Sequence, residues 1–91
     1  MNINPADIVY SKAGRDKGKP FVVISLESEL FALIADGDMR KITKPKRKKI
    51  KHLKLTGKSA DFVAEKLKNG TEVTNKELKK AIAEFINGTM A

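Results

Sequence analysis

The first half of the chain consists of short apolar segments separated by turn residues. Two of these segments, 20–26 and 30–36, are apolar on both faces, whereas 7–12 alternates apolar and polar positions and 50–55 has Leu53 and Leu55 on one face. Asp36-Gly37 is a two-residue hairpin signal, which predicts a return strand directly after it. Five short strands with tight turns in about 50 residues are typical of a small antiparallel barrel. The expected strands are 7–12, 20–26, 30–36, 38–42 and 50–55.

The hydrophobic period becomes helical in the last third of the chain. Residues 59–70 carry apolar side chains at helical spacing, with Ser59 as the expected N-cap. Residues 74–88 open with Thr74 and Glu77, the two positions of a capping box, and close at a glycine. The pattern therefore predicts two amphipathic helices joined by a short turn.

The two predicted helices need a surface to cover. Helices of this length are not stable alone, so their apolar stripes must be buried against another element. The strands that are apolar on both faces offer an outer face for this purpose. The predicted fold class is therefore mainly β with C-terminal α. We expect a small antiparallel barrel of about five strands at residues 1–56 and a two-helix hairpin at 57–91 docked on it.

The positive charge of the chain is concentrated in one segment. The chain carries 19 basic and 11 acidic residues, which gives a net charge of +8. Residues 42–58 hold eight of the basic residues and none of the acidic ones, so the other 11 basic and 11 acidic residues balance. A localised cationic patch indicates binding of a polyanion, most often a nucleic acid.

The centre of this basic segment reads KPKRKKIKHLKL, residues 44–55. Its apolar residues Ile50, Leu53 and Leu55 need burial, which neither a free tail nor a localisation signal would require. We therefore expect a basic loop at 43–49 and a basic edge strand at 50–55. Lysine on an edge strand also prevents aggregation, but one or two lysines would suffice for that role.

Composition excludes several classes of protein. The chain has no cysteine, which rules out disulfides, thiolate zinc sites and cysteine nucleophiles and fits a reducing cytosol. The first residues lack the pattern of a secretory signal, and no apolar run approaches the roughly 20 residues of a membrane span. We expect a cytoplasmic protein that does not interact with membranes.

The glycine-rich loop within residues 13–24 invites comparison with a phosphate-binding P-loop. Three residues separate Gly14 from Gly18, where a P-loop has four. Pro20 stands where Ser or Thr would hold magnesium, and a strand follows where a helix N-terminus would receive the anion. The loop is therefore not expected to bind a nucleotide.

No catalytic constellation is present in the sequence. His52 is the only histidine and lies in a lysine-rich segment, where a solvated or hydrogen-bonded role is expected. Asp36 and Asp38 flank Gly37 and are explained by turn chemistry, with an ion pair to a nearby basic residue as the second interpretation. We expect no enzyme activity, no cofactor and no metal site.

The segment DIVYSKAGRDKGKPFVVISL, residues 7–26, resembles the KOW motif, in which a basic, glycine-containing loop joins two strands. Gly14 and Gly18 are the loop glycines, and Gly18 takes the place of the motif glycine. The later ADGDMRKI and IKHLKLT are similar to the hairpin and closing strand of small KOW-containing ribosomal proteins of archaeal and eukaryotic type, and of free-standing bacterial KOW proteins. The resemblance covers about residues 5–56 and implies an SH3-like barrel that binds RNA, in particular ribosomal RNA in the context of translation.

The basic residues of both segments are expected to meet on one side of the barrel and to contact phosphates, which position a protein without reading sequence. Arg15 and Arg47 are the expected bidentate groups. Charge reversal at Lys46, Arg47 and Lys48 is expected to abolish most binding and to leave the fold intact. The candidate RNA-binding residues are Lys12, Arg15, Lys17, Lys19, Arg40, Lys41, Lys44, Lys46, Arg47, Lys48, Lys49 and Lys51.

Aromatic residues are few. The four phenylalanines (21, 31, 62 and 85) lie in apolar runs or stripes and are expected in the core. Tyr10 precedes the basic loop and could either pack in the barrel or stack on a base. We therefore expect recognition of RNA by shape and charge, with little base specificity.

A second interpretation is a protein-interaction module, in which the basic patch and the helical hairpin bind an acidic protein partner. DNA is a third possibility, because phosphate contacts alone do not separate it from RNA. In the RNA-binding interpretation, ribosomal proteins are further possible partners, and we expect a monomer when the protein is free.

Overall fold

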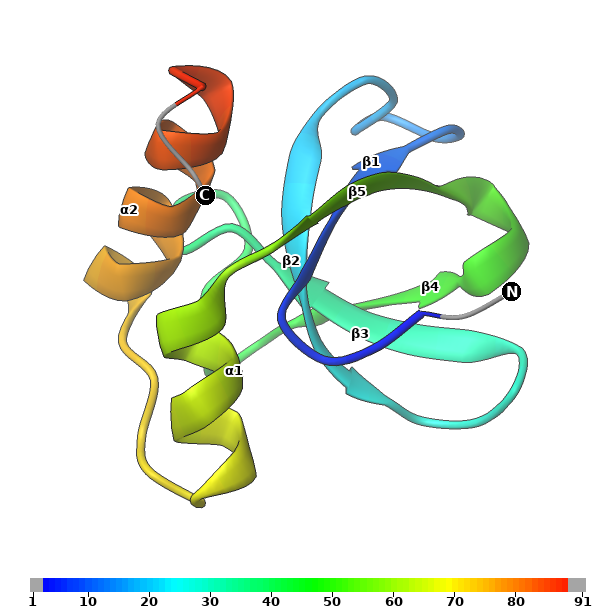
Figure 1. Ribbon diagram of the computed structural model, residues 1–91. Coiled ribbons are helices and arrows are strands. Elements are labelled where there is room, and N and C mark those ends of the chain that lie inside the picture. The colour runs from blue at the N-terminus through cyan, green and yellow to red at the C-terminus, as the bar shows by residue number, and fades with distance from the viewer. Residues whose placement is uncertain (1–2, 89–91) are drawn as a thin grey trace.

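The structure, a computed structural model, describes residues 3–88 (Figure 1), so residues 1–2 and 89–91 of the two predicted units lie outside it. It contains five strands, one short 3₁₀ turn and two α-helices. In chain order they are β1 (Asp7–Ser11), β2 (Pro20–Leu26), β3 (Phe31–Ala35), β4 (Lys46–Lys49), η1 (Ile50–His52), β5 (Leu53–Ser59), α1 (Asp61–Lys68) and α2 (Asn75–Ile86). No helix among these residues is long and apolar enough to cross a membrane.

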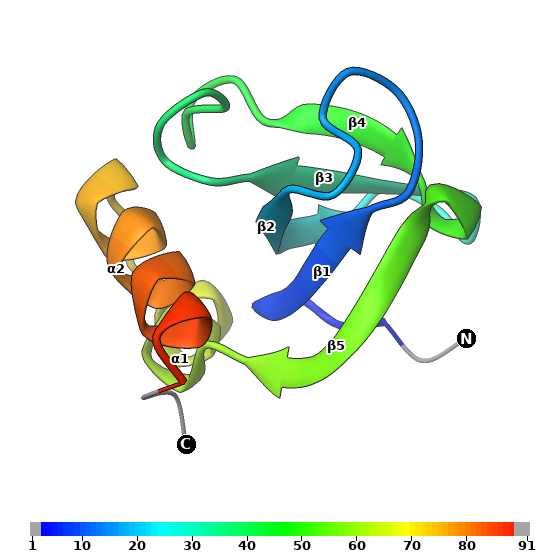
Figure 2. The ribbon, with the colours of Figure 1, turned by 90° about the horizontal axis from the view of Figure 1, so that it is seen from above.

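The strands form one antiparallel sheet with the order β4-β3-β2-β1-β5. The sheet curls, but its edge strands β4 and β5 are joined only through η1 and do not pair with each other (Figure 2). The predictions of an antiparallel, mainly β fold with C-terminal helices are therefore confirmed. The predicted closure into a barrel is not observed.

Both faces of the central strands are buried, as their apolar runs predict. On the concave face, Val9, Phe21 and Val23 pack with residues of β3 and with Leu53 of β5. On the other face, Ile8 and Val22, which are paired across β1 and β2, pack against the helices. The sheet is thus the middle layer between a small inner core and the helical hairpin.

The helical hairpin covers one end of the outer face of the sheet (Figure 1). Val63 of α1 and Leu78 and Ala81 of α2 are completely buried in this second core. The predicted capping box of α2 is confirmed, because the Thr74 side chain accepts from the Glu77 backbone at 3.2 Å and the Glu77 side chain accepts from the Thr74 backbone at 3.0 Å.

The predicted start of the first helix is wrong. Ser59 belongs to β5, where it pairs with Asp7, and the N-cap of α1 is Ala60, which has no side-chain cap. The Ala60 backbone N–H donates to the Ala6 carbonyl at 2.9 Å. The sheet therefore continues to Ser59, directly before the N-cap, and tertiary pairing determines the boundary.

The predicted return strand at 38–42 is also wrong. Asp36 Oδ1 accepts from the backbone N–H groups of Asp38 at 3.0 Å and Arg40 at 2.8 Å, which closes a local turn instead of starting a hairpin. A Cβ on Gly37 would lie 2.2 Å from the Asn75 carbonyl oxygen, so only glycine allows the turn to approach α2 this closely. Asn75 also accepts from the Ile42 N–H through its side chain at 2.7 Å. The loop 36–45 is thus fixed to the start of α2.

The strand that pairs with β3 is instead the basic segment Lys46–Lys49. The charge pattern predicted a loop there and a strand at 50–55, whereas the structure has β4, then η1, and only then β5 from Leu53. Leu33 pairs with Arg47 and Phe31 with Lys49. Most of the basic segment is therefore held rigidly on the sheet.

Candidate nucleic-acid interface

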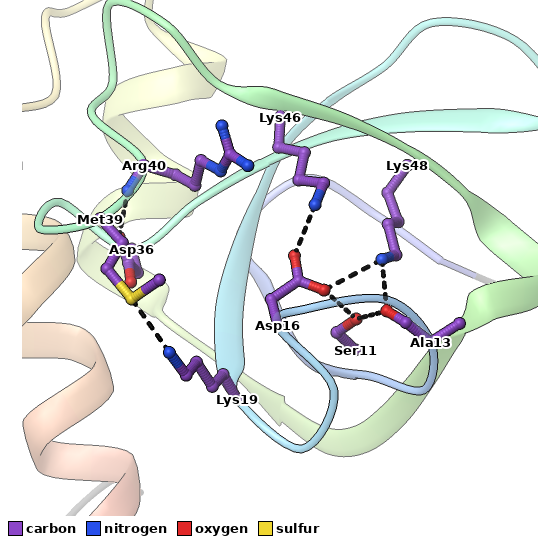
Figure 3. A network of polar contacts seen from close by, with 9 residues as sticks. All are labelled: Ser11, Ala13, Asp16, Lys19, Asp36, Met39, Arg40, Lys46 and Lys48. Atoms are coloured by element: carbon purple, nitrogen blue, oxygen red, sulfur yellow. Dashed lines mark hydrogen bonds and ion pairs between the residues drawn. The ribbon is translucent and has the colours of Figure 1, made fainter.

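The loop between β1 and β2, residues 12–19, lies over β4 and is held there by a polar network (Figure 3). Asp16 Oδ1 accepts from the Ser11 hydroxyl at 2.8 Å and from Lys48 Nζ at 3.0 Å. Asp16 Oδ2 lies 3.0 Å from Lys46 Nζ in an ion pair. Lys48 Nζ also donates to the Ala13 carbonyl at 2.6 Å. One carboxylate thus joins the loop to two lysines of β4.

Burial makes this network stronger than an ordinary surface ion pair. Asp16 is 3% exposed and Lys48 is 8% exposed. Burial alone would raise the pKa of Asp16, but the hydrogen bonds from Ser11 and Lys48 and the ion pair with Lys46 outweigh it and hold the pKa of that carboxyl well below its usual 3.8. Asp16 is therefore ionised in the folded protein at neutral pH and neutralises part of the basic segment.

The network changes the role of the central basic residues. Lys46 and Lys48 point to Asp16 (Figure 3), and the Arg47 side chain pairs with Glu27. The expectation that charge reversal of these residues leaves the fold intact does not hold for Lys48, because the substitution Lys48→Glu would bury a second carboxylate beside Asp16. Lys46 and Lys48 therefore hold the loop on the sheet, and Arg47 ties β4 to the β2–β3 turn.

The loop conformation directs two cations outward. Asp16 points into the network, whereas its neighbours Arg15 and Lys17 are exposed. Gly18 has φ +85°, and a Cβ there would meet nothing within 4 Å, so the turn conformation itself requires the glycine. The Gly18 N–H donates to the Ser11 carbonyl at 2.8 Å and closes the loop.

A second connection ties the loop to η1. The Lys12 N–H donates to the His52 carbonyl at 2.7 Å. Partial desolvation lowers the pKa of the His52 ring below its usual 6.5, and four nearby positive charges lower it further. These charges belong to Lys51, Lys49, Lys48 and Lys12. Lys12 of the loop therefore lies close enough to His52 to act on its pKa together with the lysines of the basic segment.

We call the exposed cations of this region the cationic face. All five are solvent-exposed, and none of their side chains forms a hydrogen bond or ion pair within residues 3–88. The face consists of Lys12, Arg15, Lys17, Lys49 and Lys51.

The remaining candidate residues lie nearer to α2. Lys19 Nζ contacts Met39 Sδ at 3.2 Å, and Lys41 Nζ lies 3.5 Å from the Gly37 carbonyl oxygen. Arg40 and Lys44 share the loop 36–45 with Lys41 and are exposed. This loop reaches toward α2 in both views (Figures 1 and 2). These residues extend the cationic face but do not form its centre.

The aromatic residues differ in part from the expectation. Phe21 is completely buried, as predicted. Tyr10 packs edge to face against Phe85 of α2, with 5.7 Å between ring centroids, so its ring serves packing of the sheet on the helix. Phe31 is only partly buried, and the Arg47 guanidinium lies over its ring. Because the segment 30–36 is apolar on both faces, its pattern could not predict that Phe31 lies at the end of the sheet that the helices do not cover.

No protein-family model matches this chain, and no curated protein is significantly similar to it. The KOW-like pattern of residues 7–26 therefore stands as a resemblance in sequence.

Proposed function

We propose that the protein binds RNA by its phosphate backbone through the cationic face. The main support for the proposal is that the loop 12–19 docks on β4, where Asp16 of the loop forms ion pairs with Lys46 and Lys48. Docking brings cations that are more than 30 residues apart in sequence, such as Lys12 and Lys49, close to one residue, His52. Five exposed cations without partners in the described chain form a strong local positive potential, which favours a polyanion.

RNA, and ribosomal RNA in particular, is favoured over DNA by the resemblance to KOW-containing proteins. In this proposal the protein associates with ribosomes and acts in translation. Phosphate contacts by lysine provide affinity with little sequence information. Arg15 is the one arginine of the face, and its planar guanidinium can bind one phosphate through two hydrogen bonds. Arg47 does not have this role, because its guanidinium is held by Glu27 and Phe31.

Copurification from cells, with and without nuclease, tests the proposal. We expect the protein to sediment with ribosomal subunits at moderate salt and to be released by ribonuclease. A complex with an acidic protein that survives ribonuclease would instead support a protein-interaction module. Release by deoxyribonuclease alone would identify DNA as the ligand.

The affinity for RNA should depend steeply on salt. If the five groups of the cationic face each contact one phosphate, the logarithm of the association constant falls with the logarithm of salt concentration with a slope of about −4. Fluorescence anisotropy with a labelled stem-loop RNA between 50 and 300 mM KCl, as an approximate working range, measures this slope. A slope near zero would contradict binding through phosphates.

The protonation of His52 should respond to RNA. Partial desolvation and the neighbouring lysines keep the pKa of His52 low in the free protein, and bound phosphates would offset the charge of these lysines and raise the pKa. Binding then takes up a proton when the pH lies between the free and the bound pKa, so affinity increases as the pH falls through that window. His52 is the only histidine, so its ring signals in an NMR titration with and without RNA are unambiguous. An unchanged pKa, or a His52→Gln variant with the same pH dependence of binding, would place the RNA elsewhere.

A further inference from the structure

An apolar pocket lies at the end of the sheet that the helices leave uncovered. The β2–β3 turn and η1 form this end (Figure 1). The pocket has a volume of about 350 Å³. Its lining residues are Glu29, Leu30, Phe31, Lys49, Ile50 and Lys51.

The apolar part of this pocket is unusually exposed. Leu30 is 70% exposed at the tip of the β2–β3 turn, although the protein has an inner core into which apolar residues of neighbouring strands are packed. Exposed apolar side chains bordered by charged residues are characteristic of binding sites. A surface that only attracts phosphates would not need Leu30 and Phe31.

The planar guanidinium of Arg47 lies over the Phe31 ring. Arg47 Cζ lies 3.6 Å from the ring centroid, and its Nε donates to Glu27 Oε1, which fixes the guanidinium. The Arg47 side chain is 55% exposed and the Glu27 side chain is 41% exposed. Aromatic rings and arginine planes are the surfaces on which proteins stack unpaired bases.

The rim of the pocket belongs to the cationic face. Lys49 and Lys51 line the pocket and are also two of the five exposed cations. Glu29 is the one acidic residue of the lining, so the rim has a net positive charge. A strand whose phosphates contact Lys49 and Lys51 therefore passes the mouth of an apolar pocket.

We propose that this pocket holds one unstacked nucleobase of the bound RNA, packed against Phe31, Leu30 and Ile50. The inference rests on the proposed function, because Lys49 and Lys51 hold the flanking phosphates. It adds that the ligand is a single-stranded loop, bulge or end, since a base inside a duplex would first have to break its pairing and stacking to reach the pocket. The occupant is a base and not a protein side chain, because the cations at the rim match a polyanionic backbone.

Two RNA probes of the same length test the proposal. One is a labelled 12-nucleotide single strand and the other is a fully paired duplex. We expect Phe31→Leu to weaken binding of the single strand about tenfold, as expected for loss of one base–aromatic contact, and to leave duplex binding unchanged. Leu30→Ser should weaken single-strand binding in the same selective way, and its side chain is too exposed to affect folding.

Ile86→Ser is the matched control. Ile86 is 65% exposed on α2, away from the pocket, so this variant removes a comparable exposed apolar side chain and should bind both probes like the wild type. If Phe31→Leu and Leu30→Ser also bind the single strand like the wild type, the pocket takes no base, while the RNA-binding proposal stands. If the wild type binds neither probe, the proposed function itself fails.

Photo-crosslinking provides a test without any substitution. The wild-type protein is irradiated with a single strand that contains 5-iodouridine, and the attached peptide is identified by mass spectrometry. We expect attachment at residues 29–31 or 49–51. Attachment only within 12–19 would overturn the assignment. A protein partner that resists ribonuclease and is lost in Leu30→Ser would do so as well, because the pocket would then take a protein side chain.

Discussion

A double variant, Arg15→Glu with Lys17→Glu, is expected to lower the affinity for RNA about a hundredfold. Each substitution removes a charge-assisted hydrogen bond to phosphate, worth about 1.5 kcal/mol or more, and a tenfold change corresponds to about 1.4 kcal/mol. Both side chains are exposed and have no partner in the described chain, so the free energy of unfolding should change by no more than about 0.5 kcal/mol. Anisotropy with a stem-loop RNA and urea denaturation measure the two quantities.

The control for this variant is Lys76→Glu with Lys79→Glu on α2. Both double variants lower the net charge from +8 to +4, because each reversal removes two units of charge. Lys76 and Lys79 are exposed on a helix outside the cationic face. We expect the control to lose less than about threefold in affinity, since its charges are screened beyond about one Debye length. Equal losses in the two variants would mean that overall charge, and not the cationic face, binds RNA.

Local signals in the sequence were reliable where they act within one element. The capping box at Thr74 and Glu77 needs only four consecutive residues, and it forms as predicted. The two-sided apolar pattern of residues 20–26 correctly indicated a strand buried between two layers. Both features depend on side chains that are neighbours in sequence.

Signals failed where a distant residue decided the outcome. Asp36-Gly37 has the composition of a hairpin, but contacts with Asn75 fix a different turn. The strand Lys46–Lys49 has no apolar residue, so its pattern cannot predict a strand. It pairs with β3, and its inward-facing Lys48 meets Asp16, which is 32 residues away in sequence. The sequence therefore predicted that the two basic segments meet, but not that a carboxylate joins them.

Ion pairs within the chain divide the candidate site residues into two groups. Residues whose charge is used inside the chain, such as Lys46, Lys48 and Arg47, position the surface. Residues such as Arg15 and Lys49 have no partner in the described chain and are available to a ligand. Charge density along the sequence could not separate these groups, because the separation depends on where the few acidic residues lie in space.

Asp16→Asn is expected to destabilise the protein by about 3 kcal/mol at pH 7, although it changes few atoms. The variant leaves the buried Lys48 without its counter-ion, and removal of one partner of a buried ion pair costs about 3–5 kcal/mol. The folded-state pKa of Asp16 lies below its unfolded value, so its contribution is complete above about pH 4 and is lost as the pH falls through the folded pKa. In urea denaturation, the difference between wild type and variant should therefore shrink as the pH is lowered below 4.

The same variant also tests whether RNA binding needs the loop to be held in place by Asp16 or needs only the positive charge of the protein. Asp16→Asn raises the net charge from +8 to +9, so attraction alone would strengthen RNA binding. We expect weaker binding at a temperature at which the variant is still folded, because the loop that carries Arg15 and Lys17 loses its ionic tie to β4. Asp38→Asn is the matched control: it changes the charge equally at an exposed position, and it should bind RNA slightly more tightly than the wild type. If the two variants bind alike, the cations of the loop bind RNA without being held by Asp16.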